Sequence, residues 1–423
     1  MNTNFVFVLD TDRRPLSPCH PARARELLRK GQAAVLRRFP LTIILKRSVP
    51  GASPAPCQIK LDPGSKTTGI ALVQGDKVVW GGELHHRGAL IRKKLQSRRA
   101  SRRSRRSKLR YRAPRFLNRA RKKGWLAPSL QHRVETTMTW VDRLMRFAPV
   151  DELTQELVRF DMQKMNNPEI SGTEYQQGEL LGFEVKEYLL EKWGRTCAYC
   201  GAENVPLEVE HIHPRSKGGS DRVSNLTLAC TKCNQKKGNR PVEEFLAKKP
   251  DLLKKILSKA RTSLRDAAAV NSTRWALFHR LDATGLPVTV GTGGRTKFNR
   301  KQLGWDKAHW LDAAAVGEIG ALVLATDLPL NITAKGQGGR QKAVLDKYGY
   351  PKQHRSLKPI HGWRSGDIAR CEGRTGRISP RVKGGFEMRP FDGGKPFSRP
   401  MRTFHPLHRN DGYDYSARKR AAK

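Results

Sequence analysis

Four cysteines form the part of the chain with the clearest capacity for metal chemistry. They come as two CxxC pairs, Cys197 with Cys200 and Cys230 with Cys233. Two such pairs can bring four thiolates around one tetrahedral zinc ion. The interval between the pairs is longer than in a simple zinc ribbon. This is expected if the zinc stabilises a functional segment that is inserted between the pairs.

Polar residues beside these pairs could activate water. Glu210 directly precedes His211 between the two pairs, and Asn225 follows in the same interval. Asn234 comes directly after the last cysteine. A carboxylate beside a histidine, with two amides downstream, can hold a divalent cation and activate a water. The alternative is a purely structural zinc ribbon with incidental polar residues.

The two constellations together resemble the HNH (ββα-metal) nucleases. The resemblance implies that His211 is the general base and that Glu210 and Asn234 bind a catalytic magnesium ion. It also implies that Asn225 fixes the loop and orients His211. The third position of the motif is Asn234 rather than a histidine, and its side chain still offers an oxygen ligand.

Length and charge bound the rest of the chain. The sequence has 423 residues and a formal charge of +44, from 82 basic and 38 acidic residues. This length accommodates roughly two to four domains. The positive charge exceeds what solubility requires and indicates a polyanionic partner, nucleic acid before membrane. We expect no membrane span, because no apolar run reaches about 18 residues.

Cysteine usage and the N-terminal residues indicate the compartment. Beyond the two pairs, Cys19, Cys57 and Cys371 are widely scattered, which suits a reducing cytosol with a metal site better than a disulfide scaffold. The apolar run Phe5–Leu9 is too short and too soon followed by acidic residues to be a signal peptide. We therefore expect a cytoplasmic protein.

An aspartate ends an early predicted strand. Within residues 58–73, two apolar strands flank a Pro-Gly turn, and Asp62 lies at the end of the first strand. This pattern resembles the opening hairpin of RNase H-like nucleases of the RuvC type, in which the aspartate bridges two magnesium ions. Taken alone, an aspartate before Pro-Gly is more often a turn residue.

An arginine-rich stretch follows. No acidic residue occurs from Arg87 to Arg133. As one helix from about Ala89 to Arg112, its densest part would span roughly 36 Å. Such a helix has too few apolar residues for a core and needs a polyanion to neutralise it. It resembles an arginine-rich bridge helix, which implies that it binds RNA. The arginines expected to bind RNA are Arg98, Arg99, Arg102, Arg103, Arg105 and Arg106.

The second acid of the RuvC-like site lies in the apolar segment after residue 149. We choose Glu156, with Glu152 and Asp161 as rivals, because one sequence cannot fix the strand register.

The third motif contains His309 and Asp312, which lie three residues apart and so share one face of a helix. It matches the RuvC pattern with Asp312 as metal ligand and His309 as ligand or proton shuttle, and Asp306 is the alternative ligand. Two magnesium or manganese ions need several hard oxygen ligands from separate elements, as Asp62, Glu156 and Asp312 would supply.

The order of these motifs resembles the IscB family of transposon-associated RNA-guided nucleases, compact relatives of the type II CRISPR effectors. The resemblance covers nearly the whole chain. It implies a guide (omega) RNA, a double-stranded DNA target and a monomeric protein in a ribonucleoprotein on the prokaryotic nucleoid. The HNH site would cut the guide-paired strand and the RuvC-like site the displaced strand. One departure is Pro15-Leu-Ser-Pro18, where the family usually has Pro-Leu-Met-Pro.

Two alternatives stay open at this point. One is a protein-only nuclease, such as a junction resolvase or an HNH homing endonuclease. The other is a non-catalytic RNA-binding protein, which the charge alone would support.

The predicted architecture is an α+β multidomain protein. An RNase H-like (RuvC) α/β core is split by the bridge helix and by a zinc-stapled HNH insertion, with small nucleic-acid-binding domains at both ends. The predicted boundaries are 1–55 for an N-terminal module, 56–86, 124–192 and 246–330 for the RuvC-like parts, 87–123 for the bridge helix, 193–245 for the HNH domain and 331–423 for a C-terminal RNA- and DNA-interacting domain.

Overall fold

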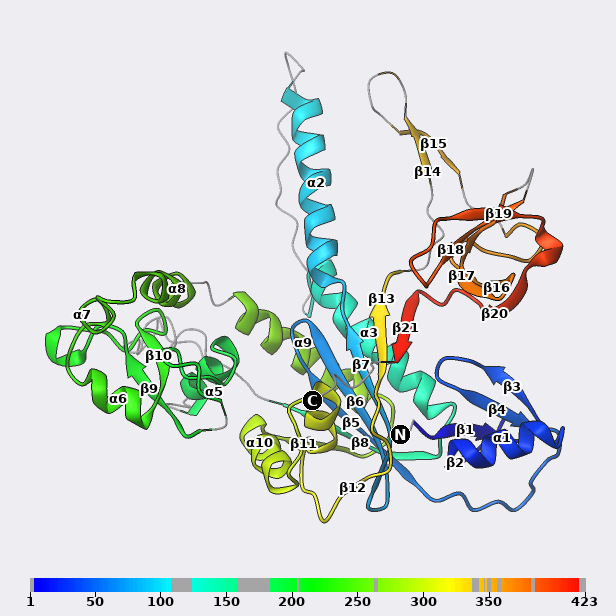
Figure 1. Ribbon diagram of the computed structural model, residues 1–423, viewed down its shortest axis with the longest axis horizontal. Helices are drawn as coiled ribbons and strands as arrows, with labels where there is room; N and C mark the ends of the chain where they lie inside the picture. The colour runs from blue at the N-terminus through cyan, green and yellow to red at the C-terminus, as the bar shows by residue number, and fades with distance from the viewer. Residues whose placement is uncertain are drawn as a thin grey trace.

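The computed structural model describes residues 4–107, 124–157, 183–203, 205–261, 265–336, 342–345, 347, 351–355, 359–381 and 385–417. A central mixed sheet is surrounded by an N-terminal module, an inserted α+β unit and a C-terminal β unit (Figure 1). Among the described helices, none combines the length and the apolar character that a membrane span requires.

The N-terminal module is a four-stranded sheet with one helix, in the order β2-β1-β4-β3. Its elements are β1 (Val6–Leu9), β2 (Pro15–Cys19), α1 (Pro21–Arg29), β3 (Ala33–Arg37) and β4 (Thr42–Leu45). Pro21 begins α1 because a first helical position needs no amide hydrogen. The His20 side chain caps the helix by accepting from the amide of Ala22.

The central sheet has eight strands, and its main path runs β11-β8-β5-β6-β7-β13-β21. Its first members are β5 (Cys57–Pro63), β6 (Thr67–Gln74), β7 (Lys77–His85), β8 (Val150–Glu156) and β11 (Val288–Gly291). Strands β5, β6 and β7 form an antiparallel meander, whereas β8 runs parallel to β5 and β11 parallel to β8. This is the strand order of an RNase H-like core, so the predicted fold class is confirmed.

The sheet extends further than the sequence predicts. Strand β13 (Leu330–Ala334) pairs with β7, and β21 (Tyr413–Ala417) pairs with β13. A short strand, β12 (Val323–Leu324), also pairs with β7. The predicted boundary between residues 330 and 331 therefore differs from the structure, in which both ends of the C-terminal segment return to the core. They cover the edge of β7, which would otherwise leave a long row of backbone groups unpaired.

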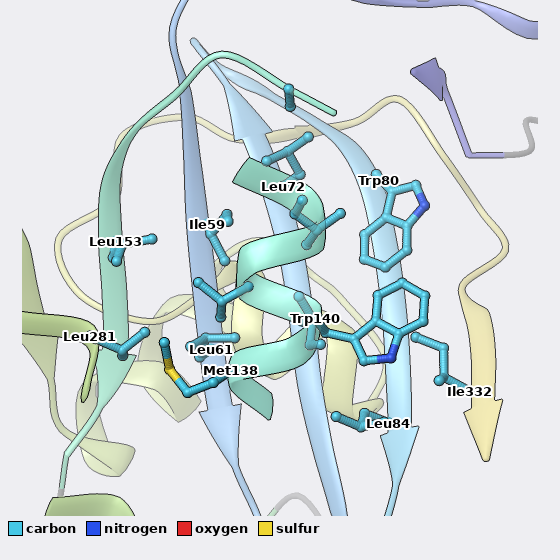
Figure 2. Packing of buried hydrophobic residues seen from close by; sticks show 14 of the residues in the cluster. Ile59, Leu61, Leu72, Trp80, Leu84, Met138, Trp140, Leu153, Leu281 and Ile332 are labelled. Carbon is cyan, nitrogen blue, oxygen red and sulfur yellow. The ribbon is translucent and has the colours of Figure 1, made fainter. Parts of the chain in front are cut away.

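One face of the sheet carries the main hydrophobic core. Helix α3 (Pro128–Met145) packs there and brings Trp140 against Trp80, with ring centroids 6.1 Å apart (Figure 2). Helix α9 (Arg265–Asp282) adds Leu281 to the same cluster. These side chains are fully buried, and each large aliphatic or aromatic group of this kind contributes about 1.5 to 3 kcal/mol by burial.

The opposite face receives α11 (His309–Ala314). On β6, Ile70 and Leu72 belong to the main core, while Ala71 packs with Trp310 in a second cluster, as the alternation of side chains along a strand requires. A Cβ atom at Gly69 would lie 1.8 Å from the carbonyl oxygen of His309, so only glycine lets α11 approach this closely.

The inserted unit lies between β8 and α9 and has a hydrophobic core of its own (Figure 1). Its elements are α5 (Phe183–Lys192), β9 (Leu207–His211), a 3-10 turn (Arg215–Lys217), β10 (Leu226–Cys230), α6 (Thr231–Lys237), α7 (Val242–Phe245) and α8 (Pro250–Ala260). The antiparallel pair β9–β10 followed by α6 is the ββα arrangement that the HNH resemblance implies.

The predicted bridge helix is α2 (Gly88–Ser107), which projects away from the sheet (Figure 1). The rest of its predicted span lies outside the described residues. So do the side chains of Arg105 and Arg106, whereas the side chains of Arg98, Arg99, Arg102 and Arg103 are exposed.

The C-terminal unit is a five-stranded antiparallel sheet in the order β19-β18-β17-β16-β20, with a separate hairpin. Its elements are β14 (Lys342–Leu345), β15 (Pro351–Arg355), β16 (Ile368–Cys371), β17 (Arg374–Ser379), β18 (Phe386–Pro390), β19 (Phe397–Arg399), a 3-10 turn (Met401–Thr403) and β20 (His405–His408). Phe386 and Phe404 pack at its centre.

Candidate active sites

Four of the predicted residues of the RuvC-like site meet at one cavity of about 220 Å³. Asp62 comes from the end of β5 and Glu156 from the end of β8. His309 and Asp312 come from α11, which lies on the face to which both acids point. The Nδ1 atom of His309 lies 3.9 Å from Oδ2 of Asp62. Strand pairing and helix packing thus gather residues that are 250 positions apart in the sequence (62 to 312).

The rivals of these residues lie elsewhere. Glu152 is at the opposite end of β8, where its carboxylate accepts a hydrogen bond from Thr289 (3.0 Å). Asp306 is exposed and does not line the cavity. Asp161 lies outside the described residues.

Two arginines hold the acids of this cavity. Nη2 of Arg274, from α9, lies 3.0 Å from Oε1 of Glu156 and 3.9 Å from Oδ1 of Asp62. Nε of Arg300 lies 2.7 Å from Oδ1 of Asp312. Arg300 belongs to α10 (Gly293–Gln302). Because both arginine side chains are almost fully buried, they compensate charges that water cannot reach.

Neither arginine was predicted from the sequence. Arg274 has no local signal, since it is one of 82 basic residues and its position depends on the packing of α9. For Arg300 the sequence offers a signal for its helix only. Thr292 is an N-cap residue, and it caps α10 by accepting from the amide of Arg295. A buried carboxylate, Glu83, was also missed, and it accepts from the amide of His309 at the start of α11 (3.1 Å).

Three carboxylates line the cavity, and basic side chains line it as well, Arg274 and Arg300 among them. Burial and the nearby charge of Asp62 raise the pKa of Asp312, although Arg300 opposes this change. Interaction with Asp62 raises the pKa of His309 despite its partial burial. A hard divalent cation bound by these carboxylates would offset the repulsion between them. The donor set therefore fits magnesium or manganese.

The four cysteines of the inserted unit form one cluster. Their sulfur atoms all lie within 4.8 Å of one another. The sulfurs of Cys200 and Cys230 are 3.8 Å apart. Among the described residues this cluster is the one with the spacing of a metal-binding tetrad, and four converging thiols fit a structural zinc ion.

His211 ends β9 and has an acidic partner that the sequence did not reveal. Its Nε2 atom lies 2.7 Å from Oδ1 of Asp221, whose other oxygen is 3.5 Å from Nη2 of Arg215. Asp221 is the acidic residue of an otherwise basic loop between the paired strands, and this contrast is the signal that could have found it. A carboxylate on one ring nitrogen fixes the tautomer and leaves the other nitrogen for a proton transfer.

Asn225 fixes the loop that follows His211. Its Oδ1 accepts from the amide of His213 (2.9 Å), and its Nδ2 donates to the carbonyls of His213 (3.0 Å) and Ser220 (2.8 Å). The contacts of the described residues include none between its side chain and His211. Asn225 therefore acts on His211 through the loop backbone, where its own carbonyl accepts from the amide of Ile212 (2.8 Å).

Glu210 and Asn234 face the same gap between β9 and α6 but bond to other partners. Oε1 of Glu210 lies 2.6 Å from Nζ of Lys237, which is fully buried. Nδ2 of Asn234 donates to Glu208 (2.5 Å), a residue that the sequence did not single out. Hydrogen bonds from Asn234 and Thr231 lower the pKa of Glu208. The oxygens of Glu210 and Asn234 suit a divalent cation, which would share Glu210 with Lys237.

Comparisons with known families agree with this geometry. Residues 6–178 match the family described as RRXRR protein, and residues 197–240 match the HNH endonuclease family. The second match ends just after α6 and contains both the cysteine cluster and His211. The chain is therefore a nuclease that carries an HNH endonuclease domain. This nuclease is metal-dependent, as its HNH domain requires.

Solved structures similar to this nuclease are much longer proteins. Streptococcus thermophilus Cas9 in complex with the GGAA PAM is 15% identical, with a TM-score of 0.23 over 60% of this chain and 32% of that one. The Type II-C Cas9 enzyme from Actinomyces naeslundii is 16% identical, with a TM-score of 0.17 over 48% of this chain and 28% of that one. The nuclease thus spans about a third of their length or less. No curated protein matches the chain.

Proposed function

We propose that this nuclease is an RNA-guided DNA endonuclease that cuts both strands of a duplex. The observation that carries the proposal is the placement of three features on one RNase H-like sheet. An acid-free cationic helix follows β7, an HNH unit is inserted after β8, and a carboxylate cavity lies at the ends of β5 and β8. Two separate hydrolytic sites suit the two strands of DNA, and the helix suits a resident polyanion.

In the HNH site, His211 takes the proton of the attacking water while Asp221 holds its imidazole ring. Glu210 and Asn234 would hold a magnesium ion, and Asn225 keeps the loop in place. The ion would supply Lewis-acid stabilisation of the leaving oxygen. This site is proposed to cut the strand that is paired with the guide RNA.

In the RuvC-like site, Asp62, Glu156 and Asp312 would hold two magnesium or manganese ions. His309 serves as a ligand or moves a proton at the edge of the cavity. Ions held there would supply electrostatic stabilisation of the scissile phosphate. This site is proposed to cut the displaced strand. The cysteine tetrad would hold a structural zinc ion that keeps the HNH unit folded.

The arginines of α2 are proposed to bind the guide (omega) RNA, and the C-terminal unit to hold that RNA and read a short motif in duplex DNA. We propose the same domain boundaries as those predicted from the sequence, except that β13 and β21 belong with the central sheet. The protein would act as a monomer in a ribonucleoprotein on the prokaryotic nucleoid.

Sequencing the RNA that co-purifies with the protein tests this function. We expect one dominant RNA species with a constant segment and a variable guide segment. Magnesium-dependent cleavage should follow the guide sequence and disappear after RNase treatment. Site-specific cleavage that survives RNase would overturn the proposal in favour of a protein-only nuclease.

Strand-specific nicking separates the two sites. His211→Ala should still nick the displaced strand, Asp62→Ala should still nick the guide-paired strand, and the double variant should cut neither. If either single variant abolishes both cuts while the protein stays folded and RNA-bound, the assignment of one site to each strand is wrong.

A further inference from the structure

A groove of about 900 Å³ runs between the base of α2 and the start of α3. One wall is a single face of α2, whose lining residues follow one another at helical spacing of three or four positions. The other wall is formed by Leu126 and the first turns of α3. Figure 1 shows α2 leaving the body of the molecule with its base beside α3.

Three apolar side chains line the groove near the base of α2, beside Arg87 and His132. Leu90 and Ile91 of α2 face Leu126 across it, and Leu90 is 46% exposed. A single exposed leucine would carry no meaning, but these three side chains line the same concave surface. Leu90 and Ile91 belong to a helix that otherwise presents cations to solvent, and with Leu126 they form an apolar floor that a ligand can contact.

The rim of the groove is cationic. Lys94 and Arg98 lie one and two turns further along the same face of α2, and no carboxylate of the described residues pairs with either. Glu135 also lines the groove, but its Oε1 accepts from Gln131 (2.6 Å) and from Arg280 of α9 (2.9 Å). Its charge is therefore directed to α9 rather than to the two cations of the rim.

We propose that this groove binds one unpaired nucleobase of the guide RNA, with the flat face of the base on Leu90, Ile91 and Leu126. The neighbouring phosphates would lie against Lys94 and Arg98. A base inside an A-form duplex has both faces stacked, so only an unstacked base can present a face to this floor. A peptide would need acidic residues at matched positions to satisfy the rim. The inference rests on the proposed RNA-guided function.

Equilibrium binding of two short RNA strands to the RNA-free full-length protein tests the proposal. One strand is an oligouridine, and the other has the same length and sugar-phosphate backbone but abasic sugars. We expect the intact protein to bind the oligouridine about fivefold more tightly, which corresponds to one base contact. Leu90→Asn should remove this preference while leaving the affinity for the abasic strand unchanged. Lys94→Gln should weaken the binding of both strands equally.

Leu36→Asn is the matched control, because Leu36 is 41% exposed on the N-terminal module, far from the groove in the sequence. It should leave the preference intact. An unchanged preference in Leu90→Asn, or an equal loss for both strands, would overturn the groove proposal. These probes need no guide sequence. The base preference can therefore persist even if guided cleavage fails, so the groove proposal and the RNA-guided function can be refuted separately.

Discussion

Nη2 of Arg274 lies 3.0 Å from Oε1 of Glu156, and both side chains are more than nine-tenths buried. The arginine is fixed on two more sides, because its Nε donates to the carbonyl of Pro63 (3.1 Å) and its own carbonyl accepts from Gln155 (2.9 Å). Its guanidinium therefore occupies the gap between two strand ends and supplies positive charge there. A metal ion held by the same acids would supply charge of the same sign.

Replacing Arg274 by methionine should destabilise the central sheet by about 3 kcal/mol, because it leaves buried carboxylates without a counter-charge. Divalent cations should restore part of this loss. Thermal unfolding with and without magnesium measures both effects, and the metal-induced rise in the unfolding midpoint should be larger in the variant than in the intact protein.

Arg280→Met is the matched control on the same helix. Arg280 pairs with Glu135 at 2.9 Å, but both side chains are 48% exposed, so its loss should cost less than about 1 kcal/mol. Equal destabilisation of the two variants, or an identical response to magnesium, would contradict the role of Arg274 as the internal counter-charge.

Asp221 should be needed for the HNH cut alone. In Asp221→Asn the carboxylate that holds Nε2 of His211 is lost, so the ring can adopt the wrong tautomer. We expect cleavage of the guide-paired strand to slow by about 100-fold under single-turnover conditions, with the displaced strand cut at its normal rate. Glutamate at this position should recover part of the rate.

Asp251→Asn provides the comparison for this variant, since Asp251 is an exposed carboxylate at the start of α8 in the same inserted unit. Both strands should be cut normally. The half-saturating magnesium concentration should also stay unchanged in Asp221→Asn. A shift in it would mean that Asp221 acts on the metal site and not on His211.

Local spacing explains what the sequence could predict. The two CxxC pairs and Glu210-His211 lie within one short insert, so the ββα unit and the cysteine cluster followed directly from them. His309 and Asp312 share a helix turn, and their common face needed no tertiary information.

Long-range packing explains what could not be predicted. Glu156 meets Asp62 only because β8 pairs with β5 in one register, and no sequence spacing encodes that pairing. Arg274 and Arg300 reach the same cavity from helices whose positions depend on the finished core. The return of β21 to the sheet joins residues more than 300 positions apart, such as Gly82 and Ala417 on either side of Leu330.

Cys233→Ser should release zinc and unfold the inserted unit. Removal of one thiolate from a four-thiolate cluster leaves three ligands, and structural zinc contributes folding free energy directly. We expect zinc content measured by elemental analysis to fall from one ion per chain to a small fraction. The guide-paired strand should then stay intact, while the displaced strand is still nicked.

Cys19→Ser separates this effect from general thiol loss. Cys19 is half-buried in the N-terminal module and lies outside the tetrad, so its replacement should leave the zinc content unchanged. A zinc content that is equally low in both variants, or unaffected in Cys233→Ser, would exclude the tetrad as the zinc site.

Asp411 should make the contact between the N-terminal module, α3 and β21 sensitive to acid. Its carboxylate contacts Arg37, lies 3.1 Å from Nη1 of Arg143, and accepts from the hydroxyl of Tyr415. Burial alone would raise the pKa of Asp411, but hydrogen bonds from His408 and Tyr415 and the charge of Arg143 lower it to about 2.

A carboxyl group with a lower pKa in the folded state stabilises that state above its unfolded pKa and loses this contribution as the pH falls. Asp411→Asn should therefore lower the free energy of unfolding by about 2 kcal/mol at neutral pH. The difference from the intact protein should shrink between about pH 5 and pH 2. Tryptophan fluorescence during denaturation can follow this, since Trp140 lies beside Tyr415. The control is Asp392→Asn, which removes an exposed partner of Arg374 and should change stability little at any pH. If Asp411→Asn instead lowers the free energy of unfolding equally at every pH, the lost contacts are not electrostatic.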